Sequence, residues 1–258
     1  MKKILFTLLA VLLVGMSASL AQSGSPVKVK TQRYKSEKCV RKKNCVEMTL
    51  AWPVLSGGNA KATKAINDSI RAFVYLAAEA DPSLPLPRAL DTAMTYSLAM
   101  LKDQTAEMED SEMGYFYELE SKVLLNNKKY ISLSMGQFIY TGGAHPGSYV
   151  QMSTYDLQTG RRIRLDEIIR DTIALRPMLE KEFLAAKTEP GQPAPVLSEI
   201  LFEDFKVLPM PENYAVTAKG VEFYYNPYEV AAYVFGPTNF TLSWEALGKL
   251  ADRRKWGL

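Results

Sequence analysis

Residues 130–165 read YISLSMGQFIYTGGAHPGSYVQMSTYDLQTGRRIRL, and this stretch decides the fold. Its first part alternates apolar and mostly polar residues with the period of a half-buried strand; the apolar positions are Ile131, Leu133, Met135 and Ile139. Two adjacent glycines then allow positive φ or close backbone approach, and Pro146 fixes the exit from the turn. We therefore predict two strands, 130–140 and 148–157, joined by a glycine-rich turn.

The flanking sequence extends this unit into a larger fold. Residues 115–125 alternate in the same way, and a short polar turn separates them from the strand at Tyr130, so three consecutive strands should form an antiparallel meander. Residues 27–34 and 46–52 also have strand character, whereas apolar residues recur at helical spacing after residue 60 and after Pro87. These patterns predict an α+β fold in which helices pack on an antiparallel sheet of hairpins and a meander.

The first 21 residues are typical of a secretory signal peptide. Lys2 and Lys3 precede an apolar run that is short for a membrane span, and small residues permit cleavage after Ala21. The alternative is an uncleaved N-terminal anchor. No later segment is apolar enough over a sufficient length to span a membrane, so we expect an exported protein, periplasmic or secreted.

The remaining chain is nearly neutral. Removing residues 1–21 takes away two of the 31 basic residues and none of the 28 acidic ones, which leaves a net charge of +1. A charge this small gives no field for nucleic acid. We expect residues 22–106 to form an N-terminal part with a disulfide hairpin and two helices. Residues 107–258 should form a C-terminal α+β part, whose core the N-terminal part could share.

Cys39 and Cys45 are the only cysteines in the chain. In an oxidising compartment, an even pair so close in sequence favours a disulfide at the tip of a hairpin. A metal or redox pair is the alternative, but it lacks further ligands, because His145 is the only histidine. No cofactor or metal site is therefore expected.

Four segments together carry a resemblance to a known family. They are FIYTGGAHP at 138–146, TYDLQTG at 154–160, IRLDEII at 163–169 and GVEFYYNPYEV at 220–230. They are similar to the core and closing motifs of a bacterial exported family of unknown function. That family forms the extracellular part of lysozyme-sensing anti-sigma factors of the sigma-V type, and it accompanies polysaccharide deacetylase domains. The cysteine hairpin and the helices after it resemble the smaller domain that often precedes it.

The resemblance implies an α+β fold and a binding role at the cell envelope, with a lysozyme-type muramidase or peptidoglycan as the partner. The chain departs from the anti-sigma factors, because it shows no transmembrane helix and no cytoplasmic sigma-binding segment. It also shows no deacetylase domain. We expect a non-enzymatic binding protein rather than an anti-sigma factor.

The candidate binding residues lie in the glycine-rich turn and in loops beside it: Tyr140, Gly142, Gly143, His145, Pro146, Tyr149 and Tyr228. Tyrosines at loops can stack on sugar rings or anchor a protein partner, although tyrosine also suits half-buried strands. His145 has three possible roles: it can hold the turn through backbone hydrogen bonds, contact a ligand, or act as a base.

An enzyme acting on cell-wall glycan is the alternative function. It would use His145 with nearby carboxylates, and Ser148, Ser153 and Asp156 follow the histidine in sequence. No serine lies in a G-x-S-x-G context, however, and both cysteines are expected to be paired. We therefore assign no catalytic residue.

Overall fold

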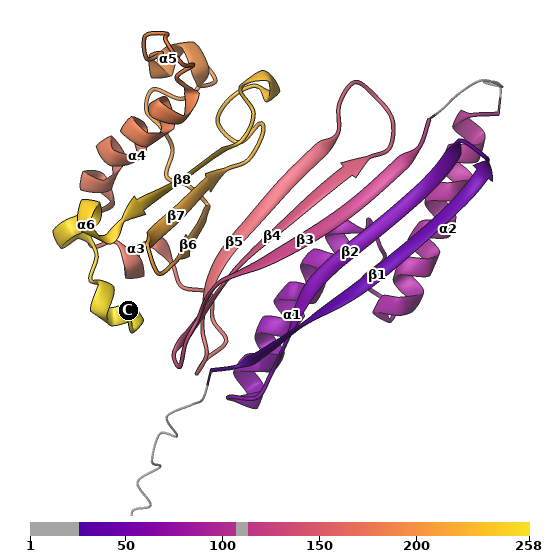
Figure 1. Ribbon diagram of the computed structural model, residues 1–258, viewed down its shortest axis with the longest axis horizontal. Helices are drawn as coiled ribbons and strands as arrows, with labels where there is room; N and C mark the ends of the chain where they lie inside the picture. Colours follow the sequence, from indigo (N-terminus) through magenta and orange to yellow (C-terminus); the bar gives the residue numbers. More distant parts are fainter. Residues whose placement is uncertain (1–25, 107–112) are drawn as a thin grey trace, which may run out of the picture.

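The computed structural model describes residues 26–106 and 113–258, so the predicted signal peptide lies outside the described residues. Two sheets form the molecule, and helices cover each of them (Figure 1). The first sheet has the strand order β1-β2-β3-β4-β5, and the second has the order β6-β7-β8. The predicted α+β class is confirmed.

The first sheet contains two hairpin-like units and one crossover. Its elements are β1 (Lys28–Arg41), β2 (Asn44–Ser56), α1 (Ala60–Ala77), α2 (Leu86–Gln104), β3 (Tyr115–Asn126), β4 (Tyr130–Tyr140) and β5 (Gly147–Asp156). Strands β3, β4 and β5 form the predicted antiparallel meander. Strand β2 pairs with β3 in parallel, from Val46 opposite Tyr115 to Leu50 opposite Leu119, which makes the sheet mixed. The parallel pairing follows from the path of the chain, because α1 and α2 lie between the two strands and form the crossover.

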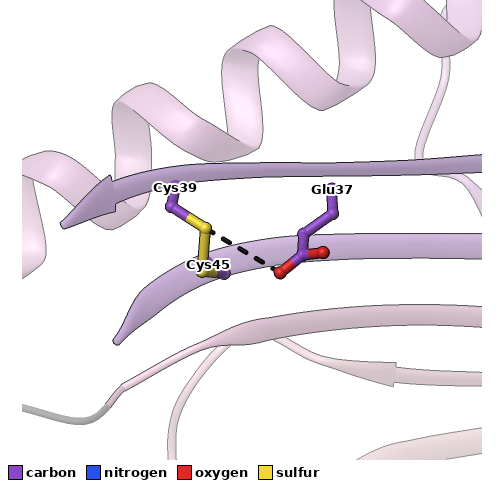
Figure 2. A group of neighbouring side chains, drawn as sticks. All are labelled: Glu37, Cys39 and Cys45. Atoms are coloured by element: carbon purple, nitrogen blue, oxygen red, sulfur yellow. Dashed lines mark hydrogen bonds between the residues drawn. A yellow bond between two sulfur atoms is a disulfide. The ribbon is translucent and has the colours of Figure 1, made fainter. Parts of the chain in front are cut away.

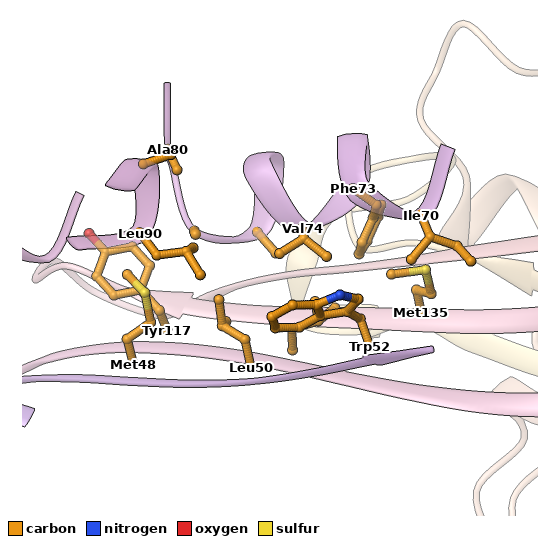
Figure 3. Packing of buried hydrophobic residues seen from close by; sticks show 14 of the residues in the cluster. Met48, Leu50, Trp52, Ile70, Phe73, Val74, Ala80, Leu90, Tyr117 and Met135 are labelled. Carbon is orange, nitrogen blue, oxygen red and sulfur yellow. The ribbon is translucent and has the colours of Figure 1, made fainter. Parts of the chain in front are cut away.

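One apolar core lies between this sheet and the two helices. Helix α1 begins at a side-chain cap, since Asn59 Oδ1 accepts hydrogen bonds from the amides of Lys61 and Ala62. Its buried face packs on the inward side chains of β2 (Figure 3); the labelled residues from these two elements are Met48, Leu50, Trp52, Ile70, Phe73 and Val74. No helix in the described part of the chain combines the length and apolar character that crossing a membrane requires.

Strand β1 forms one edge of the first sheet, since it pairs only with β2. Most of its fourteen residues are exposed. It carries one acid, Glu37, and six basic residues: Lys28, Lys30, Arg33, Lys35, Lys38 and Arg41. Charged side chains on an exposed edge discourage pairing with another chain. At the tip of the β1–β2 hairpin, Cys39 and Cys45 form the predicted disulfide.

A second core lies between the second sheet and helix α4. The remaining elements are α3 (Leu165–Ile168), α4 (Thr172–Lys187), α5 (Leu197–Ile200), β6 (Asn213–Val216), β7 (Gly220–Tyr225), β8 (Thr238–Ser243) and α6 (Trp244–Leu247), with 3-10 turns at Tyr233–Phe235, Gly248–Leu250 and Arg253–Trp256. Leu175, Leu179 and Phe183 are the buried residues of α4. This helix begins at Thr172 under an Asp171 cap and contains Pro177.

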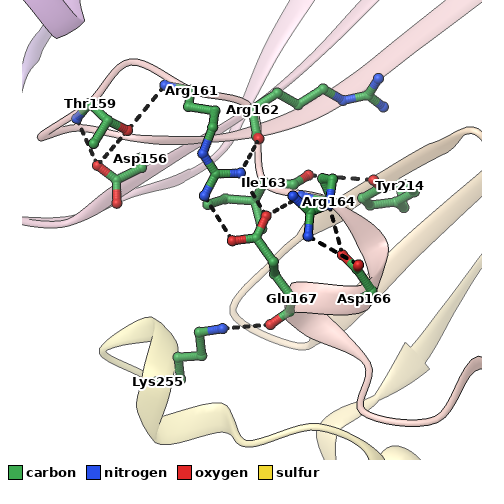
Figure 4. Close-up of polar contacts among 10 residues, drawn as sticks. All are labelled: Asp156, Thr159, Arg161, Arg162, Ile163, Arg164, Asp166, Glu167, Tyr214 and Lys255. Carbon is green, nitrogen blue, oxygen red and sulfur yellow. Dashed lines mark hydrogen bonds and ion pairs between the residues drawn. The ribbon is translucent and has the colours of Figure 1, made fainter.

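A polar junction connects β5 to the second half (Figure 4). Asp156 Oδ1 accepts hydrogen bonds from the amides of Gln158 and Thr159 and so holds the turn after β5. The Arg161 guanidinium then binds both carboxylate oxygens of Glu167 at 2.7 and 2.8 Å. Lys255, near the C-terminus, donates to the backbone carbonyl of Glu167. The predicted motif residues at 154–169 therefore have a structural role.

Candidate functional site

The predicted glycine-rich turn connects β4 and β5. Gly142 and Gly143 have φ values of +94° and +97°, a region that side chains disfavour, so the turn requires glycine at both positions. The Tyr140 hydroxyl donates to the carbonyl oxygen of Gly143 at 3.1 Å and braces the turn from within. This fixed turn determines where His145 lies.

The second element of the site is the segment after β7. The Asn226 side chain holds this segment to β5 through two hydrogen bonds, which we call the Asn226 clamp. Asn226 Oδ1 accepts a hydrogen bond from the Val150 amide at 2.7 Å, and its Nδ2 donates to the Val150 carbonyl at 3.0 Å. The Asn226 amide donates to the Glu229 carboxylate at 2.8 Å. These bonds bring the closing motif at 226–229 beside the turn at 141–146, although the two segments are about 80 residues apart in sequence.

His145, Tyr228 and Tyr233 meet at this place, and we call them the His145 cluster. The imidazole stacks on the Tyr233 ring with centroids 3.8 Å apart and planes 14° apart. His145 Nδ1 lies 3.1 Å from the Pro146 carbonyl oxygen, and Nε2 lies 3.3 Å from the Tyr228 hydroxyl. Because a carbonyl can only accept, the neutral imidazole carries its proton on Nδ1 and accepts at Nε2 from Tyr228.

Tyr228 has a strained backbone. Its φ is +64°, which is uncommon for a bulky residue, and its side chain is 56% exposed. Strained backbone positions persist only where the surrounding structure holds them in place, and they cluster at functional sites. The neighbouring Glu229 provides part of that support, and its pKa is raised because burial disfavours the charged carboxylate.

The structure brings together some of the predicted binding residues. His145, Pro146 and Tyr228 are in contact, and Tyr140, Gly142 and Gly143 form the turn that carries them. Tyr149 lies elsewhere: its ring stacks on Phe73 of α1, with centroids 6.2 Å apart, so it faces the helices. A binding role for each of these residues stays a prediction.

Sequence reasoning missed Tyr233 as a site residue. It lies five residues after Tyr228, in the 3-10 turn that precedes β8, and no motif marks it. The only available signal was the number of tyrosines near the closing motif. Beside it, Val234 is 85% exposed and Phe235 is 37% exposed, so the cluster continues into an apolar surface.

Asp156 and the two cysteines lie apart from this cluster. Asp156 is at the opposite end of β5 from His145, roughly 30 Å away for a strand of this length. Within residues 26–106 and 113–258, Glu37, Cys39 and Cys45 form the only grouping of three potential metal ligands (Figure 2). The disulfide between the two cysteines leaves no thiolate to bind a metal, so these residues do not fit a metal centre.

Family comparisons divide the chain into two matched regions. Residues 39–148 match the family described as Deacetylase PdaC, and residues 162–245 match a family described as a protein of unknown function, DUF3298. The first region contains the β4–β5 turn with His145, and the second contains Tyr228 and Tyr233. The His145 cluster therefore draws its residues from both matched regions. A comparison with curated proteins found no match.

Solved structures show the same fold. A DUF3298 family member from Bacteroides fragilis NCTC 9343 is 20% identical, with a TM-score of 0.66 over 88% of this chain and 94% of its own. A DUF3298 family protein from Pseudomonas aeruginosa PAO1 is 16% identical, with a TM-score of 0.54 over 88% of this chain and 95% of its own. These findings confirm the resemblance to a family of unknown function and to a deacetylase-related region. The anti-sigma-factor context stays a prediction.

Proposed function

We propose that the protein is a non-enzymatic, exported binding protein of the bacterial cell envelope, and that the His145 cluster contacts its ligand. Peptidoglycan is the ligand that the chemistry of the cluster fits best, because exposed aromatic rings held at loops can stack on the faces of sugar rings. A lysozyme-type muramidase is the second candidate. Aromatic anchors also dominate protein interfaces, and the exposed Val234 and Phe235 beside the cluster favour a protein partner.

The observation that carries this proposal is the preorganisation of the cluster. Two hydrogen bonds and one ring stack fix the His145 imidazole, and the Asn226 clamp fixes the segment that presents Tyr228. A rigid, exposed aromatic surface binds with little loss of side-chain entropy. Within the described residues, His145 contacts Pro146, Tyr228 and Tyr233 rather than a carboxylate or a serine hydroxyl, which supports binding rather than glycan hydrolysis.

Co-sedimentation with insoluble peptidoglycan tests the proposal. The purified protein should bind saturably, and Tyr228→Ala or Tyr233→Ala should weaken binding about tenfold. Tyr96→Ala is the matched control, because Tyr96 is 67% exposed on α2, away from the cluster, and should not matter. Equal binding by all four proteins would exclude the cluster as the glycan site.

Two further measurements separate the alternatives. Surface plasmon resonance against an animal-type lysozyme at physiological salt tests the muramidase partner with the same variants. Incubation with peptidoglycan tests the enzymatic alternative: product release that His145→Ala abolishes would show catalysis and contradict the proposal. A pure binding protein releases no product, with or without the histidine.

A further inference from the structure

A groove on the molecule is lined by none of the residues of the His145 cluster. It has a volume of about 660 Å³ and opens between the β1–β2 hairpin and the start of α2, beside α1. Sites for small molecules have volumes of roughly 300–1,000 Å³.

The floor of the groove is apolar and contains one unused hydrogen-bond donor. Trp52 of β2, Ile70 of α1 and Leu90 of α2 line it, and each is at most 4% exposed. Within residues 26–106 and 113–258, no protein atom accepts a hydrogen bond from the Trp52 indole N–H. Figure 3 shows the Trp52 ring beneath α1, with its nitrogen on the side toward that helix. The indole nitrogen itself is not fully buried, so it reaches the open space of the groove, where an oxygen of a ligand can accept its proton.

The other polar groups of the groove are mostly engaged. The Asn67 side chain donates to the Leu55 carbonyl and accepts from the Leu55 amide, both at 2.9 Å. The Tyr75 hydroxyl donates to the Leu84 carbonyl at 2.8 Å. These bonds fix the walls, so the groove keeps its shape without a ligand.

The charge around the opening is positive. Arg33 and Arg71 line the groove, and Asp91 is the only acid in its lining. The Tyr34 hydroxyl donates to Asp91 Oδ1 at 3.0 Å, and Arg71 pairs with Asp68 outside the lining. Strand β1, which forms one wall, contributes further basic residues and a single acid. The electrostatic field at the opening therefore favours an anion.

From these features we propose that the groove binds a small amphipathic anion, an apolar chain or ring that carries one carboxylate or phosphate head group. The apolar part lies on Trp52, Ile70 and Leu90. An oxygen of the ligand accepts the Trp52 N–H, and the head group lies toward Arg71. The site is independent of the peptidoglycan proposal, because it shares no residue with the His145 cluster.

Isothermal titration calorimetry with ten-carbon probes below their critical micelle concentrations tests this site. Decanoate should bind one-to-one. It should bind more tightly than decanol, which is uncharged, and more tightly than decyltrimethylammonium, which carries the opposite charge. Decyl phosphate in place of decanoate distinguishes a phosphate from a carboxylate head. Decanoate binding no tighter than decanol binding would overturn the proposal.

Charge variants give a prediction with opposite signs. Arg71→Gln should weaken decanoate binding about threefold, and Asp91→Asn should strengthen it about threefold, because both residues line the opening. Arg253→Gln, an exposed arginine in the C-terminal 3-10 turn, is the control and should have no effect. Charge variants without effect, or effects of the same sign, would contradict an anion site.

The tryptophan variant tests the floor. Trp52→Phe keeps an aromatic ring but removes the donor, so decanoate should bind about tenfold more weakly. Trp244→Phe is the control, since the Trp244 N–H donates to Thr217 in the second half. Unchanged affinity in Trp52→Phe would contradict the assigned contact. If circular dichroism shows that Trp52→Phe does not fold, the Arg71 and Asp91 variants alone test whether the groove binds an anion.

Discussion

Tyr228 combines exposure, a positive φ and a role in the His145 cluster. For an L-residue, the left-handed conformation costs roughly 1–2 kcal/mol, which glycine avoids. Tyr228→Gly should therefore change the free energy of unfolding by less than about 1 kcal/mol, because relief of strain offsets the lost contact with His145. Tyr228→Val should lower it by about 1–3 kcal/mol relative to the glycine variant, since a β-branched residue fits this conformation poorly. Urea denaturation measures both values.

The same pair of substitutions on a helix provides the control. Tyr96 is exposed in the middle of α2, where valine is the better residue and glycine the worse. The order of stability should thus be reversed at Tyr96. A valine variant at Tyr228 as stable as the glycine variant would contradict the observed backbone conformation.

Glu167 predicts a dependence of stability on pH. Hydrogen bonds from Arg161 lower its pKa from 4.5 to about 2. Because the pKa of Glu167 is lower in the folded state than in the unfolded state, the ionised carboxylate stabilises the folded state at pH values above about 4.5. This contribution is lost as the pH falls from about 4.5 toward 2. Arg161→Gln removes this partner. At pH 6 the substitution should lower the free energy of unfolding by an amount on the order of 1 kcal/mol, because the carboxylate is partly solvated. At pH 2.5 the loss should be smaller.

Denaturant unfolding at the two pH values measures this difference. Arg253→Gln removes an exposed arginine from the same half of the chain and should show no pH-dependent change. An Arg161→Gln effect of equal size at both pH values would mean that the ion pair does not determine the pKa of Glu167.

Residue-level chemistry was partly predictable from the sequence. The glycines at 142 and 143 indicated a turn with positive φ, and the two cysteines indicated a disulfide, because both signals are local. The orientation of Tyr149 and the inclusion of Tyr233 were not predictable. Each depends on which distant segment packs beside it, Phe73 of α1 in one case and the turn at His145 in the other.

At the scale of elements, the tight pairing of β7 with β8 makes Gly220 a sensitive position. A Cβ atom at residue 220 would lie 2.0 Å from the Leu242 carbonyl oxygen, so the two strands would have to separate. Gly220→Ala should lower the free energy of unfolding by about 3 kcal/mol. Gly147→Ala is the matched control: its Cβ would meet the Ile139 carbonyl at an ordinary 3.8 Å, and we expect a change within about 0.5 kcal/mol.

Thermal and urea unfolding of the two alanine variants measure these effects. Similar stabilities would show that β7 and β8 are not as closely apposed as the structure has them.

Elements were more predictable than their pairing. The meander strands were expected at 115–125, 130–140 and 148–157, within one residue of each observed end, because alternation and turn residues are local signals. The parallel pairing of β2 with β3 escaped prediction. It joins residues that are about 70 positions apart, and it depends on how two amphipathic helices cover the sheet between them.

At the scale of the whole molecule, β5 links the two cores. The Val216 amide of β6 donates to Thr154 Oγ1 at 2.9 Å, and the Met152 amide donates to Asn213 Oδ1 at 3.2 Å. Leu125 of β3 packs in the second core. We therefore expect the two cores to unfold cooperatively, and the destabilising Gly220→Ala change in the second sheet should reduce hydrogen-exchange protection in β2 by the same free energy as in β7.

Exchange measured by mass spectrometry after proteolysis checks this expectation. It also tests the predicted boundary between residues 22–106 and 107–258. Unchanged protection in β2, together with reduced protection in β7, would show that the halves unfold as separate units.

The basic edge strand concentrates positive charge at one edge of the first sheet, although the net charge of the chain is small. Strand β1 carries six basic residues against one acid, whereas the chain without residues 1–21 has a net charge of only +1. Four of the acids that offset this charge, Glu107, Glu109, Asp110 and Glu112, lie outside the described residues. Near a negatively charged surface, the excess positive charge of β1 would orient the molecule with this strand foremost, over distances of about one Debye length, roughly 8 Å at physiological salt.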